Sequence, residues 1–76
     1  MTEEFIDILK SVNPMVMEGD GLSLVADNII DSLDVINIVV KMEEKYNIKF
    51  ESDDISVENF ASVKSIWDLI QRLKGA

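Results

Sequence analysis

The stretch DSLDVINIVVKMEEKY, residues 31–46 of this 76-residue chain, carries the clearest helical pattern in the sequence. Asp31 can accept a hydrogen bond from the amide of Asp34 as an N-cap, and the Asp34 carboxylate can reach back to the cap. At about 100° per residue, one face then gathers apolar side chains along the whole stretch, namely Val35, Ile38, Val39, Met42 and Tyr46. This pattern predicts a helix from Ser32 to about Tyr46 whose apolar face lies in the core.

A second group of apolar side chains lies nearly opposite this core face. We call it the docking stripe: Leu33, Ile36 and Val40, which share their side of the helix with Asn37, Glu43 and Glu44. One small bundle cannot easily bury both sides of one helix, and an exposed apolar stripe that ends in acids is typical of a surface that binds another protein. The alternative is that the long loop before the helix folds over the stripe.

Two more segments have the helical spacing of apolar residues. One runs from Glu3 to Val12, where Thr2 is the expected N-cap. Pro14 ends this helix, because proline disfavours helical geometry in the residue before it. The other helix runs from Val63 to about Leu73, with Ser62 as its N-cap.

The two connections between these helices differ in length. In the second connection, residues 56–60 can form a short turn of helix that places Phe60 in the core. The first connection, from Asn13 to Asp31, is long, and its apolar side chains are numerous enough to pin it onto the bundle: Met15, Val16, Met17, Leu22, Leu24 and Val25. We therefore expect one all-α domain over residues 1–76, a small bundle of three main helices plus one short helix, with a long first loop.

Charge and composition restrict the functions that fit this chain. The formal net charge of −8 works against binding to nucleic acid and favours basic partners. The chain has no cysteine and no histidine, so disulfides, thiolate metal sites and the commonest general base near neutral pH are missing. We therefore expect a protein that is acted upon by enzymes and is not itself an enzyme.

Metal binding and membrane insertion are not expected either. Glu51, Asp53 and Asp54 form an acidic run that is too short and unpatterned for a calcium loop. The apolar runs are far shorter than the roughly 20 residues of a spanning helix. The acidic, amphipathic N-terminal residues do not have the pattern of a secretory signal, which leads us to expect a cytoplasmic protein.

Ser32 stands between two aspartates in the first turn of the predicted central helix. Taken alone, this arrangement is an ordinary helix start. Its surroundings are more specific, because DSLD, then Val35-Ile36, then Ile38-Val39, then MEEKY resembles the serine region of acyl carrier proteins. The later stretch DDISVENFASVKSIWDLI is similar to the short third helix and the capped last helix of that family, so the resemblance covers essentially the whole chain.

The resemblance implies a function and a site. Ser32 would carry 4′-phosphopantetheine, attached from coenzyme A by a phosphopantetheinyl transferase, and Asp31 would help to present it to that enzyme. The thiol of the arm would carry an acyl group as a thioester. The docking stripe would be the surface gripped by ligases, ketosynthases or acyltransferases with basic docking surfaces, and the carrier would be a monomer. Met42 would lie close to the point where the bundle parts for an acyl chain.

The chain also departs from the pattern of fatty-acid carriers. Asn37 stands where those carriers typically have glutamate, and NIIDS replaces their usual Leu-Gly-Ala-Asp-Ser. The replacement more closely resembles aminoacyl and peptidyl carriers and specialised stand-alone carriers, with Asn28 in place of a glycine. Asparagine tolerates left-handed backbone angles.

Three functions remain open. The first is an acyl carrier for fatty acid, polyketide or specialised biosynthesis. The second is a stand-alone aminoacyl or peptidyl carrier loaded by an adenylating ligase. The third is a helical interaction module without a prosthetic group, in which the docking stripe simply binds a partner.

Overall fold

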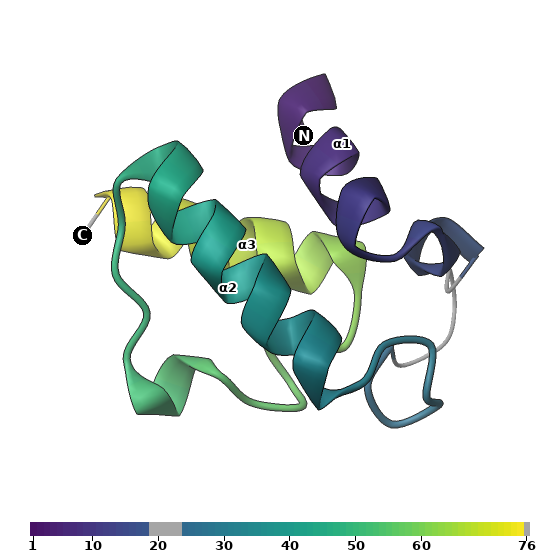
Figure 1. Ribbon diagram of the computed structural model, residues 1–76. Coiled ribbons are helices and arrows are strands. Elements are labelled where there is room, and N and C mark those ends of the chain that lie inside the picture. The colour runs from purple at the N-terminus through teal and green to yellow at the C-terminus, as the bar shows by residue number, and fades with distance from the viewer. Residues whose placement is uncertain (19–23, 76) are drawn as a thin grey trace.

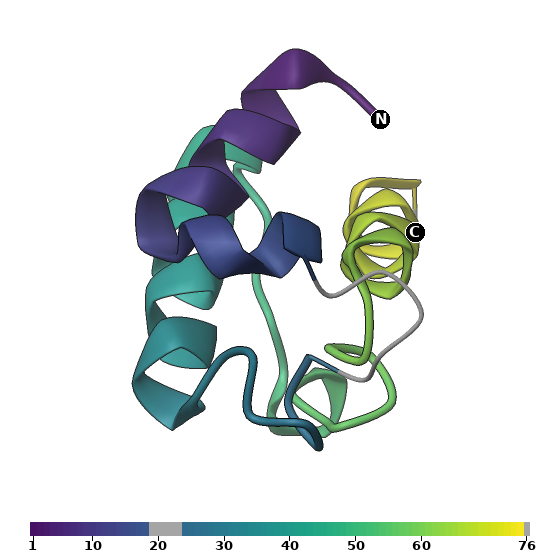
Figure 2. The same ribbon diagram turned by 90° about the vertical axis from the view of Figure 1, so that its right-hand side faces the viewer.

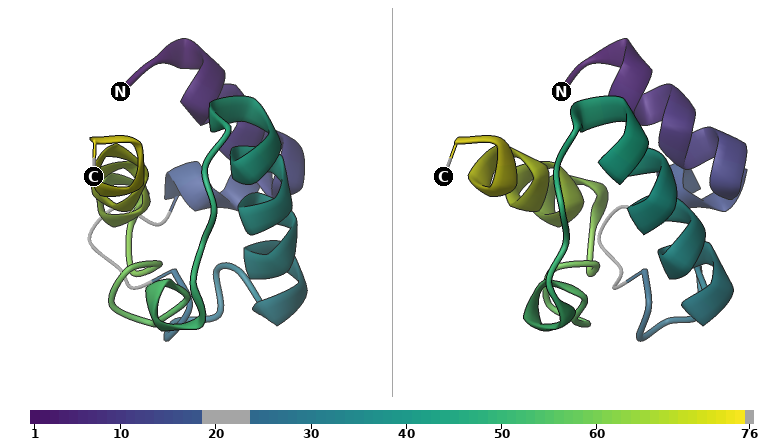
Figure 3. Two further views of the ribbon diagram at one scale, coloured as in Figure 1. Left: turned by 90° about the vertical axis from the view of Figure 1, so that its left-hand side faces the viewer. Right: turned by 60° about the vertical axis from the view of Figure 1, so that its left-hand side comes forward.

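The computed structural model describes residues 1–18 and 24–75, and every regular element in these residues is a helix. The elements in chain order are α1 (Glu3–Val12), the 3₁₀ helix η1 (Pro14–Glu18), α2 (Ser32–Tyr46), the 3₁₀ helix η2 (Ser52–Asp54) and α3 (Val63–Gly75). Figure 1 shows α2 crossing in front of α3. Figures 2 and 3 show that α1 and α2 lie together on one side of the bundle and α3 on the other. The predicted all-α class is confirmed.

The first helix has the predicted bounds and the predicted cap. Thr2 Oγ1 accepts a hydrogen bond from the amide of Phe5 at 3.3 Å. The chain leaves the helix in an extended conformation at Asn13, as expected for a residue before proline. Pro14 then begins η1, where its missing N–H does no harm in a first turn.

The 3₁₀ helix η1, which the sequence did not predict, occupies five of the first six residues of the first connection. Val16 and Leu24 are buried and Val25 is half-buried, so these residues pin the connection as predicted. Met15 is exposed, which contradicts its predicted role. Leu22 and the side chain of Met17 lie outside the described residues.

The central helix begins and ends where the sequence predicted. Asp31 Oδ1 accepts a hydrogen bond from the amide of Asp34 at 2.9 Å, and Asp34 Oδ2 accepts one from the amide of Asp31 at 3.4 Å. These reciprocal bonds form a capping box, which satisfies amides that have no partner within the helix. The helix ends at Asn47, whose φ of 54° turns the chain out of the helix.

The short turn predicted at residues 56–60 is present, but the short regular helix of this connection lies elsewhere. The 3₁₀ helix η2 lies earlier, at Ser52–Asp54, where Asp54 Oδ2 accepts a hydrogen bond from the amide of Glu51 at 2.9 Å. Residues 56–60 form a single turn in which the amide of Phe60 donates to the carbonyl oxygen of Ser56 at 3.1 Å. Phe60 is nevertheless fully buried, as predicted.

The last helix begins at Val63 and continues to Gly75, slightly beyond the predicted end at Leu73. Ser62 Oγ accepts a hydrogen bond from the amide of Ser65 at 3.0 Å, which confirms the predicted N-cap. Trp67 packs edge-on against Phe5 of α1, with ring centroids 4.9 Å apart, so its role is in the packing of the core. The buried core contains side chains from all three α-helices and both connections: Phe5, Leu9, Val16, Leu24, Ile30, Val35, Ile38, Val39, Met42, Phe50, Phe60, Ile66, Leu69 and Ile70.

Candidate functional site

Ser32 is the first residue of α2, and its side chain is exposed to solvent. The acids on either side are held by the fold, because Asp31 and Asp34 cap each other through the bonds described above. This arrangement leaves Ser32 exposed beside the positive end of the helix dipole. A phosphate ester at this position would lie near the amides of the first helical turn, which is a favourable site for an anion.

The start of α2 is also tied to the end of α1, through a residue that the sequence did not single out. The side-chain amide of Asn13 donates to Asp34 Oδ2 and to the carbonyl oxygen of Ile29, both at 3.1 Å. Asn13 Oδ1 accepts a hydrogen bond from the amide of Met15 at 2.9 Å, which fixes the orientation of the amide group. Asn13 therefore helps to position the turn that carries Ser32.

The segment that leads into Ser32 is shaped by a left-handed residue. Asn28 has a φ of 59°, the conformation that its place in the glycine position predicted. The chain folds back there, so that the amide of Ile30 donates to the carbonyl oxygen of Leu24 at 2.9 Å. The amide of Leu24 donates in turn to the carbonyl oxygen of Ala61 at 2.7 Å, which joins this segment to the start of α3.

The apolar residues of the docking stripe face solvent. Leu33 is 63% exposed, Ile36 is 57% exposed and Val40 is 46% exposed. Asn37 and Glu44 are exposed on the same helix. The alternative in which the long first connection folds over the stripe is therefore wrong. The opposite face of α2 is buried along its length, so the two faces divide as predicted.

Glu43 has a different position from the rest of the docking stripe. Its side chain is half-buried, and its Oε2 accepts a hydrogen bond from the amide of Phe50 at 3.0 Å. Phe50 is a buried residue in the connection after α2, so this bond satisfies a backbone amide next to the core. Glu43 thus has a structural role that the sequence pattern did not indicate.

Replacing Glu43 with alanine is expected to lower the free energy of unfolding by about 1–2 kcal/mol, because a partly buried amide loses a charged acceptor. The matched control is Glu44→Ala, which removes an exposed carboxylate from the next position and should change stability by less than about 0.5 kcal/mol. Urea unfolding of both variants measures the difference. Equal stabilities would show that the bond to Phe50 contributes nothing.

A lysine near the end of α2 pairs with α1, away from the docking stripe. Lys45 Nζ lies 2.9 Å from Glu4 Oε2, and both side chains are substantially exposed. The hydrogen bond and the charge of Lys45 hold the pKa of the Glu4 carboxyl below its ordinary value, and the same bond raises the pKa of Lys45. The pair is therefore kept until the pH falls through the lowered pKa of Glu4. Because it is exposed, it adds little to stability.

An open apolar pocket of about 350 Å³ lies next to Ser32. Its lining comes from the first turns of α2, from the segment before α2 and from the turn before α3: Val25, Ser32, Val35, Ile36, Ile55, Ser56, Val57 and Phe60. Figure 1 shows why these segments meet, since the connection after α2 returns to the end of the bundle where α2 begins. Met42, predicted to lie near such an opening, is fully buried and does not line the pocket.

The chemistry of the pocket is simple, because the lining is hydrocarbon apart from two serines. It can remove an apolar chain from water, and it offers no charged partner to a buried ammonium or carboxylate group. The sequence did not predict that Ile55 and Val57 line a pocket. The only signal was that both are apolar residues in an otherwise acidic connection.

Among the side chains that the structure describes, no group of three or more from histidine, cysteine, aspartate and glutamate could hold a metal ion. In the same part of the chain, each helix is too short or too polar to span a bilayer.

The chain is similar in sequence to an acyl carrier protein from Buchnera aphidicola subsp. Baizongia pistaciae (strain Bp), with 43% identity over 49 residues. The aligned residues make up 64% of this chain and span 60% of the length of the curated relative. No family model matches the chain. No solved structure matches it either. Acyl carrier proteins are non-catalytic carriers, in agreement with the prediction that the chain is not an enzyme. This similarity supports the prediction, made from the residues around Ser32, that the chain resembles the acyl carrier protein family.

Proposed function

We propose that this chain is an acyl carrier that holds its cargo as a thioester on a 4′-phosphopantetheine arm attached to Ser32. The observation that carries the proposal is the place of Ser32, an exposed hydroxyl at the first position of α2 and at the edge of an apolar pocket. The similarity to an acyl carrier protein supports the same function from the sequence.

The residues around Ser32 fit the attachment of such an arm. In the attachment step, Ser32 Oγ forms the new bond to phosphorus, its proton passes to a base of the transferase, and the nucleotide part of coenzyme A departs. The arm then supplies the thiol that accepts the acyl group. Asp31 is exposed beside Ser32, and we infer that it helps to present this turn to a basic, magnesium-bearing transferase.

The pocket favours an acyl group over an aminoacyl group as the cargo. Val35, Ile36 and Phe60 give it a hydrocarbon lining that stabilises an alkyl chain by burial. The ammonium group of an aminoacyl thioester would lose its hydration there without gaining a partner, which is costly. The second candidate, a stand-alone aminoacyl carrier, would have to keep its cargo outside this pocket. Loading assays with different acyl donors identify the pathway, whether fatty acid, polyketide or another.

The partners would bind the docking stripe. Its exposed apolar side chains would be buried when a partner binds, which stabilises the complex. The net charge of −8 attracts basic surfaces. We infer that the transferase, the loading ligase or acyltransferase, and a ketosynthase share this stripe in turn. The carrier would do this as a monomer in the cytoplasm.

The direct test is the intact mass of the chain after incubation with coenzyme A, magnesium and a promiscuous phosphopantetheinyl transferase. The expected result is the gain of one phosphopantetheine. A folded chain that gains no mass would contradict the proposal and favour an interaction module without a prosthetic group. Loading of the modified chain with fatty acyl and aminoacyl donors then separates the first candidate from the second.

Shortening Leu33 to alanine is expected to reduce kcat/KM of the transferase by about tenfold, because an interface residue of this kind contributes about 1.4 kcal/mol or more. The side chain is exposed, so the fold should tolerate the change. Met15→Ala is the matched control, because Met15 is similarly exposed but belongs to η1. Equal rates for both variants would show that the stripe does not bind the transferase.

A further inference from the structure

The pocket beside Ser32 has one wall that does not belong to a helix. We call residues 54–60 the wall turn. Its side chains Ile55, Ser56, Val57 and Phe60 line the pocket opposite the first turns of α2. Phe60 is fully buried and fixes one end of the turn, whereas Ile55 and Val57 are 44% and 51% exposed. The position of this exposed part therefore determines how wide the pocket is.

Asn59 holds the wall turn together from within. Its side-chain amide donates to the carbonyl oxygen of Asp54 at 2.9 Å, which closes the turn across its ends. Its backbone amide donates to Ser56 Oγ at 3.2 Å. Both bonds are partly buried, and Asn59 does not itself line the pocket.

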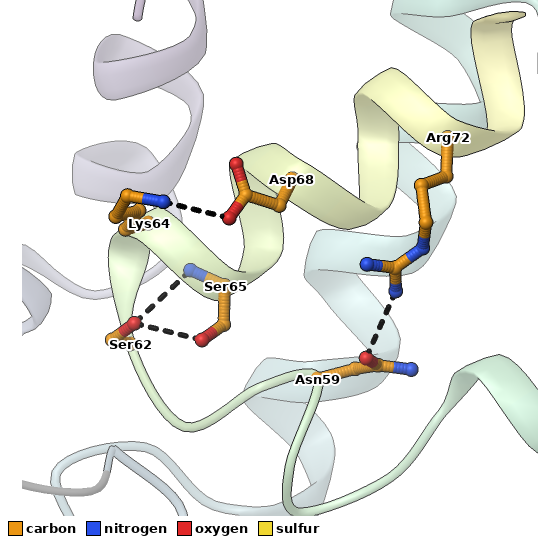
Figure 4. A network of polar contacts seen from close by, with 6 residues as sticks. All are labelled: Asn59, Ser62, Lys64, Ser65, Asp68 and Arg72. Atoms are coloured by element: carbon orange, nitrogen blue, oxygen red, sulfur yellow. Dashed lines mark hydrogen bonds and ion pairs between the residues drawn. The ribbon is translucent and has the colours of Figure 1, made fainter.

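The same side chain connects the wall turn to the last helix. Arg72 of α3 donates from Nη2 to Asn59 Oδ1 at 3.1 Å, and Figure 4 shows its side chain reaching from the helix down to the loop. With its amide bound to Asp54 and its carbonyl oxygen bound to Arg72, Asn59 uses both ends of its side chain. The wall turn therefore has a bond to α3 in addition to the burial of Phe60.

We propose that Asn59 and Arg72 are positioning residues that hold the wall turn in place and so set the size of the acyl chain that the pocket shelters. This inference rests on the proposed carrier function. It goes beyond that function in naming two residues that neither touch the cargo nor belong to the docking stripe. Releasing the turn should widen the pocket on average and leave a longer chain less protected from solvent, while a chain too short to fill the pocket is unaffected.

The test uses Arg72→Met, which removes the donor and keeps much of the side-chain length. Lys64→Met is the matched control, because Lys64 is an exposed cation on the same helix whose ion pair, to Asp68 at 2.9 Å, stays within α3 (Figure 4). Amide hydrogen exchange is measured first, on the unmodified chains. An exposed charged hydrogen bond is weak, so exchange at the amides of Asn59 and Phe60 should rise by about threefold in Arg72→Met alone. Unchanged exchange would overturn the proposal.

The second measurement is the rate at which hydroxylamine cleaves the octanoyl and acetyl thioesters of the modified chains. In Arg72→Met the octanoyl rate should rise by about threefold while the acetyl rate stays the same, and Lys64→Met should resemble the wild type. A rise for both thioesters, or for neither, would overturn the proposal, since a general loss of structure does not discriminate by chain length. If the wild type cannot be modified at Ser32, the carrier function itself fails, and the role of the two residues in chain selection fails with it.

Discussion

Replacing Ser32 with alanine is expected to abolish the attachment of phosphopantetheine completely, because no other group at the start of α2 can form the bond to phosphorus. The fold should be kept. Ser32 is exposed, and the capping box that begins α2 uses Asp31 and Asp34 instead. The free energy of unfolding should therefore change by less than about 0.5 kcal/mol. Intact mass after incubation with the transferase measures the first effect, and urea unfolding measures the second.

The matched control for this experiment is Ser56→Ala. Ser56 is the other serine that lines the pocket, so it tests whether position in the pocket alone is sufficient. Its Oγ already accepts a hydrogen bond from the amide of Asn59, and it does not lie at the start of an α-helix. We expect Ser56→Ala to be modified like the wild type. A mass gain that survives in Ser32→Ala and disappears in Ser56→Ala would move the attachment site to the wall turn.

Shortening Phe60 to alanine is expected to lower the free energy of unfolding by about 3–5 kcal/mol, because it leaves a large cavity in the core. Phe60 is fully buried, and its ring lies 6.4 Å from that of Phe50. Small domains have roughly 0.05–0.15 kcal/mol of stability per residue, so the variant should be close to unfolding at room temperature. Urea unfolding followed by circular dichroism measures the loss.

Two further variants make the result for Phe60 specific. Val57→Ala shortens a side chain of the same turn that is half exposed, and it should cost much less because little burial is lost. Phe60→Leu keeps most of the apolar volume and should recover a large part of the stability. If Phe60→Ala were no worse than Val57→Ala, the turn would not depend on Phe60 as its anchor.

The helices were predictable because their signals are local. Each of the three α-helices begins after an N-cap that can be read from the sequence, at Thr2, Asp31 and Ser62. Each also has one continuous apolar face. In the second connection, the later residues form the single turn that the sequence predicted. The 3₁₀ helix that precedes this turn, where the amide of Glu51 bonds to Asp54, was not predicted.

Long-range contacts explain what the sequence could not predict about the site. The exposed stripe on α2 and the place of Ser32 follow from helical periodicity and one cap. The bond between Asn13 and Asp34 joins residues far apart in the sequence, and no local pattern indicates it. The bond from Phe50 to Glu43 and the pocket wall at Ile55 and Val57 likewise depend on how the second connection returns to the helix.

The packing of Trp67 against Phe5 gives the chain an internal optical probe. Trp67 is the single tryptophan of the sequence, and its ring meets that of Phe5 across the junction between α3 and α1. Its fluorescence emission therefore reports whether α1 is docked, whereas far-ultraviolet dichroism averages over all the helices. A coincident transition in the two signals indicates that the bundle unfolds as one cooperative unit. An earlier change in emission would instead reveal that α1 detaches before the helix that carries Ser32 unfolds.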